Sequence, residues 1–283
     1  MKKLTLLLAT AIICLIATAQ EKKDTIRIGG MVIVKEGKNK NGKSKGIHMS
    51  RNHEPKIKRN ISTNWWVLDL GFSNYDDKTN YSTAGSYLVS RPGYPALDKN
   101  DFKLRTGKSI NVNIWVFMQK LNLIKHHVNL KYGLGFELNN YRYKSDISYK
   151  EGGLVPYSAN TQTNAPFIFR DSISFSKNKL AADYLTVPLM LNFASHPGNK
   201  KGVSLSVGVS AGYLYSQRNK QKSSERGKWK NKGDYDLEKF KFSYVAEVGL
   251  GPIRLYGSYS PNSIYEKSLD IRPYTVGLRF SNW

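Results

Sequence analysis

Eight stretches of this chain alternate apolar and polar residues with a period of two. In Val128–Leu138 one face reads Val, Leu, Tyr, Leu, Phe, Leu, and the other reads Asn, Lys, Gly, Gly, Glu. Val203–Tyr215 and Phe240–Leu250 repeat the pattern. Because successive side chains of a β-strand point to opposite faces, this alternation predicts strands with one apolar and one polar face. Such strands are typical of transmembrane β-barrels.

The N-terminus predicts a cleaved secretory signal peptide over residues 1–19. Two lysines precede the apolar run Leu4–Ile16, and residues 17–19 form an A-x-A cleavage site. The run is short for a membrane span, which disfavours an anchor. Cys14 lies inside it and is the single cysteine of the chain, so we expect a mature protein without disulfides or cysteine-ligated metals.

The mature chain is strongly basic, because removing Lys2 and Lys3 with the signal peptide lowers the formal charge only from +23 to +21. Nucleic acid is a common partner of basic proteins, but an exported protein does not meet it, so we expect none. The anions along the export route are lipopolysaccharide phosphates, anionic surface glycans and the cell wall. We expect contact with outer-membrane lipid above all; solubility alone is the alternative reason for the charge.

Residues 20–63 are predicted to form a basic, low-complexity periplasmic arm. Lys35–Gly46 has no apolar residue and cannot build a core. Thr25–Val34 is an exception, with the composition of a short strand pair. The barrel is predicted over residues 64–283. Its strands are expected at Trp65–Ser73, Ser109–Met118, Val128–Tyr143, Ala182–Phe193, Val203–Tyr215, Phe240–Leu250, Ile253–Tyr259 and Pro273–Ser281.

The connections between these strands alternate in length. The long connections are 74–108, 144–181 and 216–239. The short connections are 119–127, 194–202 and 251–252. An up-and-down barrel with long outer loops and short periplasmic turns has this alternation, and it places both termini in the periplasm. We therefore expect an all-β fold, an eight-stranded antiparallel up-and-down transmembrane β-barrel in the outer membrane, present as a monomer.

The direction of the two faces needs further evidence, because a soluble lipocalin-like barrel also alternates, with its apolar face inside. Charges of both signs lie on the polar face and can pair in a narrow lumen: Asp69, Lys131, Glu137, Lys241, Glu247, Arg254 and Arg279. Aromatic residues recur near strand ends of the apolar face, as in membrane-interface girdles: Trp66, Tyr132, Tyr213, Tyr215, Phe240, Tyr259, Tyr274 and Phe280. Both features favour apolar side chains outside.

Three stretches carry a resemblance to a known family. They are YLTVPLMLNF (Tyr184–Phe193), GPIRLYGSYS (Gly251–Ser260) and YTVGLRFSNW (Tyr274–Trp283). In order and spacing they resemble the PorT-like group of outer-membrane β-barrel domains of Bacteroidetes. The resemblance implies an eight-stranded outer-membrane barrel and, by family analogy, an accessory role in protein export. In the first stretch Pro188 cannot donate a ladder hydrogen bond, and we expect a β-bulge there.

Residues suited to catalysis or metal binding are few. Some small barrels are hydrolases that need a base near the outer rim. The histidines lie elsewhere, in the arm or in the short turns: His48, His53, His126, His127 and His196. Glycines alternate on the polar face, where small residues relieve crowding: Gly133, Gly135, Gly208, Gly212 and Gly249. We expect no enzyme activity, no cofactor and no metal.

Two groups of residues remain as functional candidates. The inner charges either form a salt-bridged plug or line an ion path, and we expect the plug because eight strands enclose a space that side chains can fill. The long connection 216–239 carries a basic set around a tryptophan: Lys220, Lys222, Arg226, Lys228, Trp229, Lys230 and Lys232. This set suits lipid phosphates or anionic glycans, with a solvated loop as the alternative. We expect a structural or interaction role; export or narrow-pore transport are the alternatives.

Overall fold

The computed structural model describes residues 25–28, 31–34, 59–197, 202–250 and 253–281. The expected signal peptide, His48 and His53 lie outside these residues. The chain divides into two compact units, residues 1–58 and 59–283, which are described separately. In the first unit β1 (Thr25–Ile28) pairs antiparallel with β2 (Met31–Val34), which confirms the short strand pair expected there.

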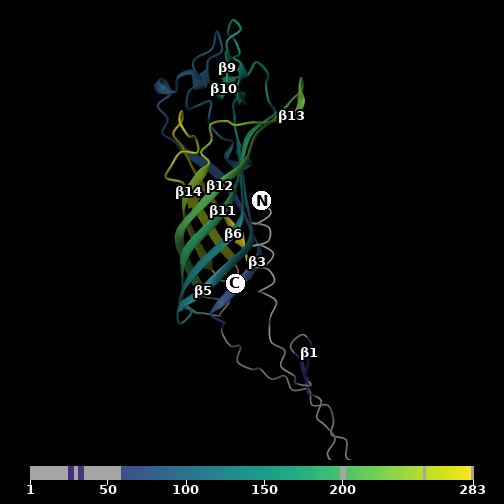
Figure 1. Cartoon of the computed structure of the whole chain (residues 1–283), viewed down its shortest axis with the longest axis vertical. Helices are drawn as coiled ribbons and strands as arrows, with labels where there is room; N and C mark the ends of the chain where they lie inside the picture. The colour runs from purple at the N-terminus through teal and green to yellow at the C-terminus, as the bar shows by residue number, and fades with distance from the viewer. Residues whose placement is uncertain (1–24, 29–30, 35–58, 198–201, 251–252, 282–283) are drawn as a thin grey trace, which may run out of the picture. The chain divides into compact units, whose positions relative to one another are not determined.

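In the described part of the second unit, eight strands close into one antiparallel ring (Figure 1). Each strand pairs with its neighbours along the chain, and the last pairs with the first, so the ring leaves no open edge. The ring strands are β3 (Ile61–Asp77), β5 (Ile110–Ile124), β6 (Val128–Arg142), β11 (Lys177–Ala194), β12 (Val203–Ser223), β14 (Phe240–Leu250), β15 (Ile253–Tyr259) and β16 (Ile271–Phe280). The predicted fold class is confirmed.

The barrel has a turn end, where short connections join the strands, and a loop end, where the long connections gather (Figure 1). The first strand starts and the last strand finishes at the turn end. The loop end contains short strands that alternation does not predict: β4 (Leu88–Val89), β7 (Ile147–Lys150), β8 (Gly153–Leu154), β9 (Gln162–Thr163), β10 (Phe167–Arg170) and β13 (Gly227–Lys232). It also contains the short 3-10 helices η1 (Tyr81–Thr83), η2 (Gly85–Tyr87) and η3 (Thr106–Lys108). Among the described residues, no helix is long and apolar enough to cross a membrane.

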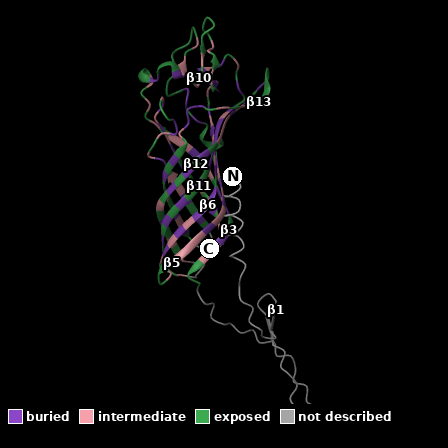
Figure 2. Ribbon diagram, viewed as in Figure 1, coloured by how far each residue is buried: buried purple, intermediate pink, exposed green. Residues whose placement is uncertain are grey.

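The two faces of the barrel wall have the expected direction. Exposed and buried positions alternate along the strands (Figure 2). On β11, Leu185, Leu189 and Phe193 are exposed, whereas Asn192 is buried in the interior. The aromatic residues expected at the girdles are 36–71% exposed, apart from the half-buried Tyr132. Apolar side chains therefore form an outer belt, and the lipocalin-like alternative is wrong.

The structure corrects the bulge expected at Pro188. Pro188 stays in register opposite Ser210 of β12, and toward β6 the pairing stops after Thr186 and resumes in the same register at Leu189. The register between β11 and β12 shifts instead between Asp183 and Tyr184, where Tyr215 is the extra residue of β12. The sheet accommodates the missing N–H of proline by losing the two pairings of Val187 and Pro188 with β6, without an inserted residue.

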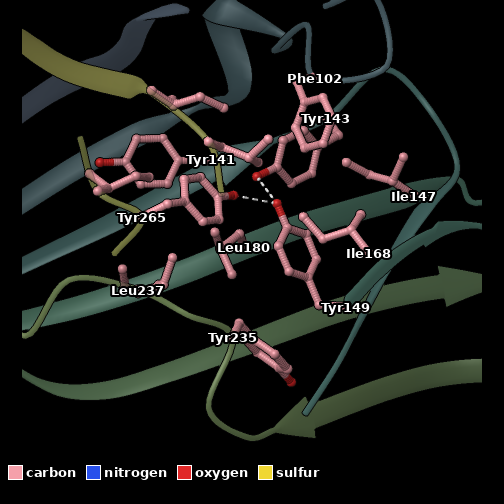
Figure 3. Close-up of a cluster of buried hydrophobic side chains, with 14 of the residues drawn as sticks. Phe102, Tyr141, Tyr143, Ile147, Tyr149, Ile168, Leu180, Tyr235, Leu237 and Tyr265 are labelled. Carbon is pink, nitrogen blue, oxygen red and sulfur yellow. Dashed lines mark hydrogen bonds between the residues drawn. The ribbon is translucent and has the colours of Figure 1, made fainter. Parts of the chain in front are cut away.

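The loop end has a hydrophobic core of its own, built largely by the long connections (Figure 3). The hydroxyl oxygens of Tyr143 and Tyr149 lie 2.6 Å apart, and those of Tyr149 and Tyr265 lie 2.7 Å apart. Burial raises the pKa of Tyr143 to about 12. The rings pack among buried side chains that include Phe102, Ile147, Ile168, Leu180 and Leu237. The long connections thus form a packed cap in which the hydroxyls of Tyr143, Tyr149 and Tyr265 are hydrogen-bonded to one another.

Candidate functional site

Inside the barrel, the charged residues predicted for the lumen are brought together around Glu247 of β14. Its carboxylate lies 2.7 Å from Lys131 Nζ and 2.6 Å from Arg279 Nη1. Arg254 Nη1 lies 3.0 Å from the same carboxylate. Arg279 also contacts Asp69 through two atoms, Nε and Nη2, each 2.7 Å from a carboxylate oxygen. All five side chains are buried or nearly so.

A second ion pair joins Glu137 of β6 to Lys241 of β14, nearer the loop end. Asparagines link it to the first group. Asn139 donates to Glu137 at 3.0 Å, and Asn113 donates to Asp69 at 3.1 Å. Asn111 completes the link, because its amide nitrogen lies 2.9 Å from an amide oxygen of each of these asparagines. We did not select these amides from the sequence, although they alternate on the polar face like the charges.

The lumen is therefore crossed by one continuous network of paired charges and amides. Burying a charge is costly unless it is paired and hydrogen-bonded, so this arrangement is a stable filling of the interior. Tyr256 adds bulk, since its ring lies against the paired glycines Gly71 and Gly277 and its hydroxyl donates to Asn111. No group of His, Cys, Asp or Glu side chains in the described ranges has the geometry of a metal site.

The predicted basic set lies on an extension of the barrel wall, where β12 continues past Tyr215 and pairs with β11 and β13. The register puts Lys220 opposite both Lys179 and Lys230. Lys179 and Leu185 are six residues apart on β11 and so lie on the same face, which therefore continues the apolar outer belt. We call this outward surface the cationic face; its members are Arg142, Lys177, Lys179, Arg218, Lys220, Lys222, Lys228, Lys230 and Lys232.

Like charges dominate the cationic face. Asp183 lies among them and pairs with Arg218 at 2.6 Å. Burial, with the charges of Lys220 and Lys177, lowers the pKa of Lys179 to about 8. Burial and the charges of Arg218 and Lys230 lower the pKa of Lys220. Cations directly opposite one another destabilise a sheet, so an external anion on this face would relieve the repulsion.

The structure divides the predicted basic set between two surfaces. Lys220, Lys222, Lys228, Lys230 and Lys232 belong to the cationic face. Trp229 alternates with its lysine neighbours and lies opposite Gln221, so its ring is on the inward side of the hairpin. Arg226 lies in the turn, with Nη1 3.1 Å from Asp171 Oδ2. The tryptophan and the lysines therefore do not form a single contact surface.

A comparison with known protein families agrees with the barrel. A family model described as "Outer membrane protein beta-barrel domain" matches residues 54–262. One similar solved structure is that of Ail, the attachment invasion locus protein of Yersinia pestis: the identity is 11%, 77% of this chain and 98% of that chain are covered, and the TM-score is 0.29. A second, Ail in complex with the heparin analogue sucrose octasulfate, has 12% identity, the same coverage and a TM-score of 0.30. A comparison with curated proteins finds no match. Because the family match spans most of the chain, this protein belongs to the outer membrane protein beta-barrel domain family and is an outer-membrane β-barrel.

Proposed function

We propose that this protein is a monomeric barrel with a closed lumen, and that its cationic face binds the phosphates of outer-leaflet lipopolysaccharide. The loop end then lies at the cell surface, and both termini lie in the periplasm. Short turns at one end and long loops at the other support this orientation, which is the usual one for such barrels. We assign the protein an interaction role and no catalytic chemistry.

The position of the cationic face carries this proposal. The face begins where the apolar belt ends, since Arg218 closely follows the exposed girdle residues Tyr213 and Tyr215. Lys179 lies six residues beyond Leu185 on β11, which is about 20 Å along a strand. In a tilted barrel strand this distance spans the head-group layer just outside the hydrocarbon core. Lysines at that level meet lipid phosphates rather than acyl chains.

The energetics also favour an anionic lipid. A basic side chain near an anionic membrane surface contributes about 1 kcal/mol, and the effect is screened by salt. The cationic face gathers such side chains on adjacent strands, so several act on one lipid head group. The lowered pKa of Lys179 also predicts how binding depends on pH. Phosphate binding stabilises the charged form of the lysine, so binding should weaken as the pH rises through about 8.

The test is lipid retention by the full chain extracted from outer membranes. We expect lipopolysaccharide to stay bound through a detergent wash, and we expect Lys220→Gln/Lys222→Gln/Lys230→Gln to lose most of it. The matched control removes three exposed lysines elsewhere, Lys78→Gln/Lys108→Gln/Lys267→Gln. Equal retention by the two variants, or retention that does not depend on salt, would contradict the proposal.

A second candidate is an accessory role in protein export, which rests on the PorT-like resemblance of the stretches now seen in β11, β15 and β16. In the export role, deletion of the gene should reduce the amount of secreted cargo, and expression of the triple lysine variant should restore it. That pair of results would favour export over lipid binding. Narrow-pore transport is the weaker alternative, because the paired charges described above fill the lumen.

A further inference from the structure

A cavity of about 470 Å³ opens at the loop end, on the inward side of the β12–β13 hairpin. Its volume is within the range of small-molecule sites. Aromatic side chains form much of its wall, namely Tyr149 of β7, Phe169 of β10 and Trp229 of β13. Trp229 is 58% exposed, which leaves a face of the largest aromatic side chain open to solvent. An exposed tryptophan over a cavity indicates a binding surface for a flat or ring-shaped ligand.

Fixed polar groups lie beside this aromatic wall. Asp171 is buried, and its Oδ2 accepts hydrogen bonds from Ser148 Oγ at 2.8 Å and Arg226 Nη1 at 3.1 Å. Gln221 Nε2 donates to Ser148 Oγ at 2.7 Å. The amides Asn219 and Asn231, which pair across the two strands, also line the cavity. These groups come from β7, β12 and β13, from the residue after β10 and from the β12–β13 turn, so they are held in place before any ligand arrives.

The charge of the cavity wall is positive. Arg226 and Lys150 both line the cavity, and Asp171 balances one of them through its ion pair. The guanidinium of Arg226 is half exposed, so it keeps donors available for a second acceptor. A ligand with a carboxylate would find cations at the rim and amides deeper in the wall.

We propose that this cavity binds an acidic sugar residue. A pyranose ring has an apolar C–H face that packs on an indole, and hydroxyls that both donate and accept hydrogen bonds. Trp229 provides the platform, and Lys150 and Arg226 take the carboxylate. The amide nitrogens of Asn219, Gln221 and Asn231 donate to protein atoms, so their amide oxygens accept from the sugar hydroxyls. The inference rests on the proposed function only in placing the loop end at the cell surface, where glycans are present.

The test is saturation-transfer NMR on the detergent-solubilised full chain with small glycosides as probes. We expect methyl glucuronide or the methyl glycoside of 3-deoxy-octulosonate to bind with a Kd in the millimolar range, and methyl glucoside to bind more weakly. Preference for octulosonate points to the core of the cell's own lipopolysaccharide, and preference for glucuronide points to a surface polysaccharide. Saturation by none of the probes would overturn the proposal.

Variants on β13, together with one on β7, separate the two sites. Trp229→Ala should weaken binding of the preferred probe at least tenfold, Trp229→Phe should keep part of it, and Lys150→Gln should abolish the preference for the acidic sugar. Lys228→Gln and Lys230→Gln flank Trp229 on the opposite face and should leave sugar binding unchanged.

Anomalous gel migration before heating reports whether each variant is folded. Unchanged affinity in a folded Trp229→Ala variant would contradict the sugar site. Unchanged lipid retention in the triple lysine variant, with sugar binding intact, would instead contradict only the lipid proposal.

Discussion

Replacing Glu247 by glutamine tests whether the lumen network holds the barrel together. The glutamate side chain is 0% exposed and accepts from Lys131, Arg254 and Arg279 within 3.0 Å. Glutamine has nearly the same shape, so the change removes a charge without creating a cavity. Three buried cations would then share the remaining carboxylates of the network, and Asp69 is already paired with Arg279.

The structure sets the size of the effect. Removing one partner of a buried ion pair costs about 3–5 kcal/mol, because the other charge is left uncompensated. At about 1.4 kcal/mol for each factor of ten, this lowers the ratio of folded to unfolded protein by about two to three and a half decades. Adding Lys131→Met should recover part of the loss, since it removes one of the stranded cations.

The assay is urea unfolding in detergent micelles, scored by the fraction of protein that keeps the migration of the unheated barrel. The control is Glu266→Gln, since Glu266 is 47% exposed and lies 3.6 Å from the exposed Lys267. Such a surface pair contributes about 0–1 kcal/mol. If Glu247→Gln costs no more than this control, or if Lys131→Met does not compensate, the network is not what stabilises the interior.

Gly208→Ala should cost about 1–3 kcal/mol in the same assay, because a Cβ there would lie 2.1 Å from the Leu189 carbonyl oxygen; Gly107→Ala, with nothing within 4 Å, should be neutral. Alkaline pH should loosen the loop-end core. Burial raises the pKa of Tyr143 from 10.0 to about 12, so the stability it contributes is present below pH 10 and lost as the pH rises to 12, as tyrosinate absorbance would show. In planar bilayers the protein should give no steady single-channel current, and a stable current would contradict the closed lumen.

The parts of the fold that follow a period are the parts that the sequence predicts. Each ring strand buries one face, so its residues must alternate, and alternation can be read directly. The inner charges were identifiable for the same reason, because Glu247 and Lys131 fall on the polar side of two such strands. Their pairing follows from the free-energy cost of burying a charge, because buried charges without partners are rare.

The loop-end core has no such period. Tyr87, Tyr149 and Tyr265 come from three different connections, and each lies in a segment whose apolar residues follow no strand or helix repeat. Their burial depends on contacts between distant segments, such as the hydrogen bond from the Tyr87 hydroxyl to the Tyr235 carbonyl oxygen. A single sequence holds no local signal for such packing, so these connections were predicted only as long loops.

The surfaces proposed for lipid and sugar depend on one residue that breaks the alternation. Up to Tyr215 the odd-numbered residues of β12 face outward, and an unbroken pattern would carry Asn219 and Gln221 to the outside and Lys220 to the inside. Tyr215 is the extra residue at the register shift, so beyond it the even-numbered residues face outward. A slip of one residue exchanges the two faces of a strand completely. The bulge therefore puts the lysines on the outward face proposed to bind lipid and the amides beside the cavity, and it marks the point where the predicted strand ended and the real one continued.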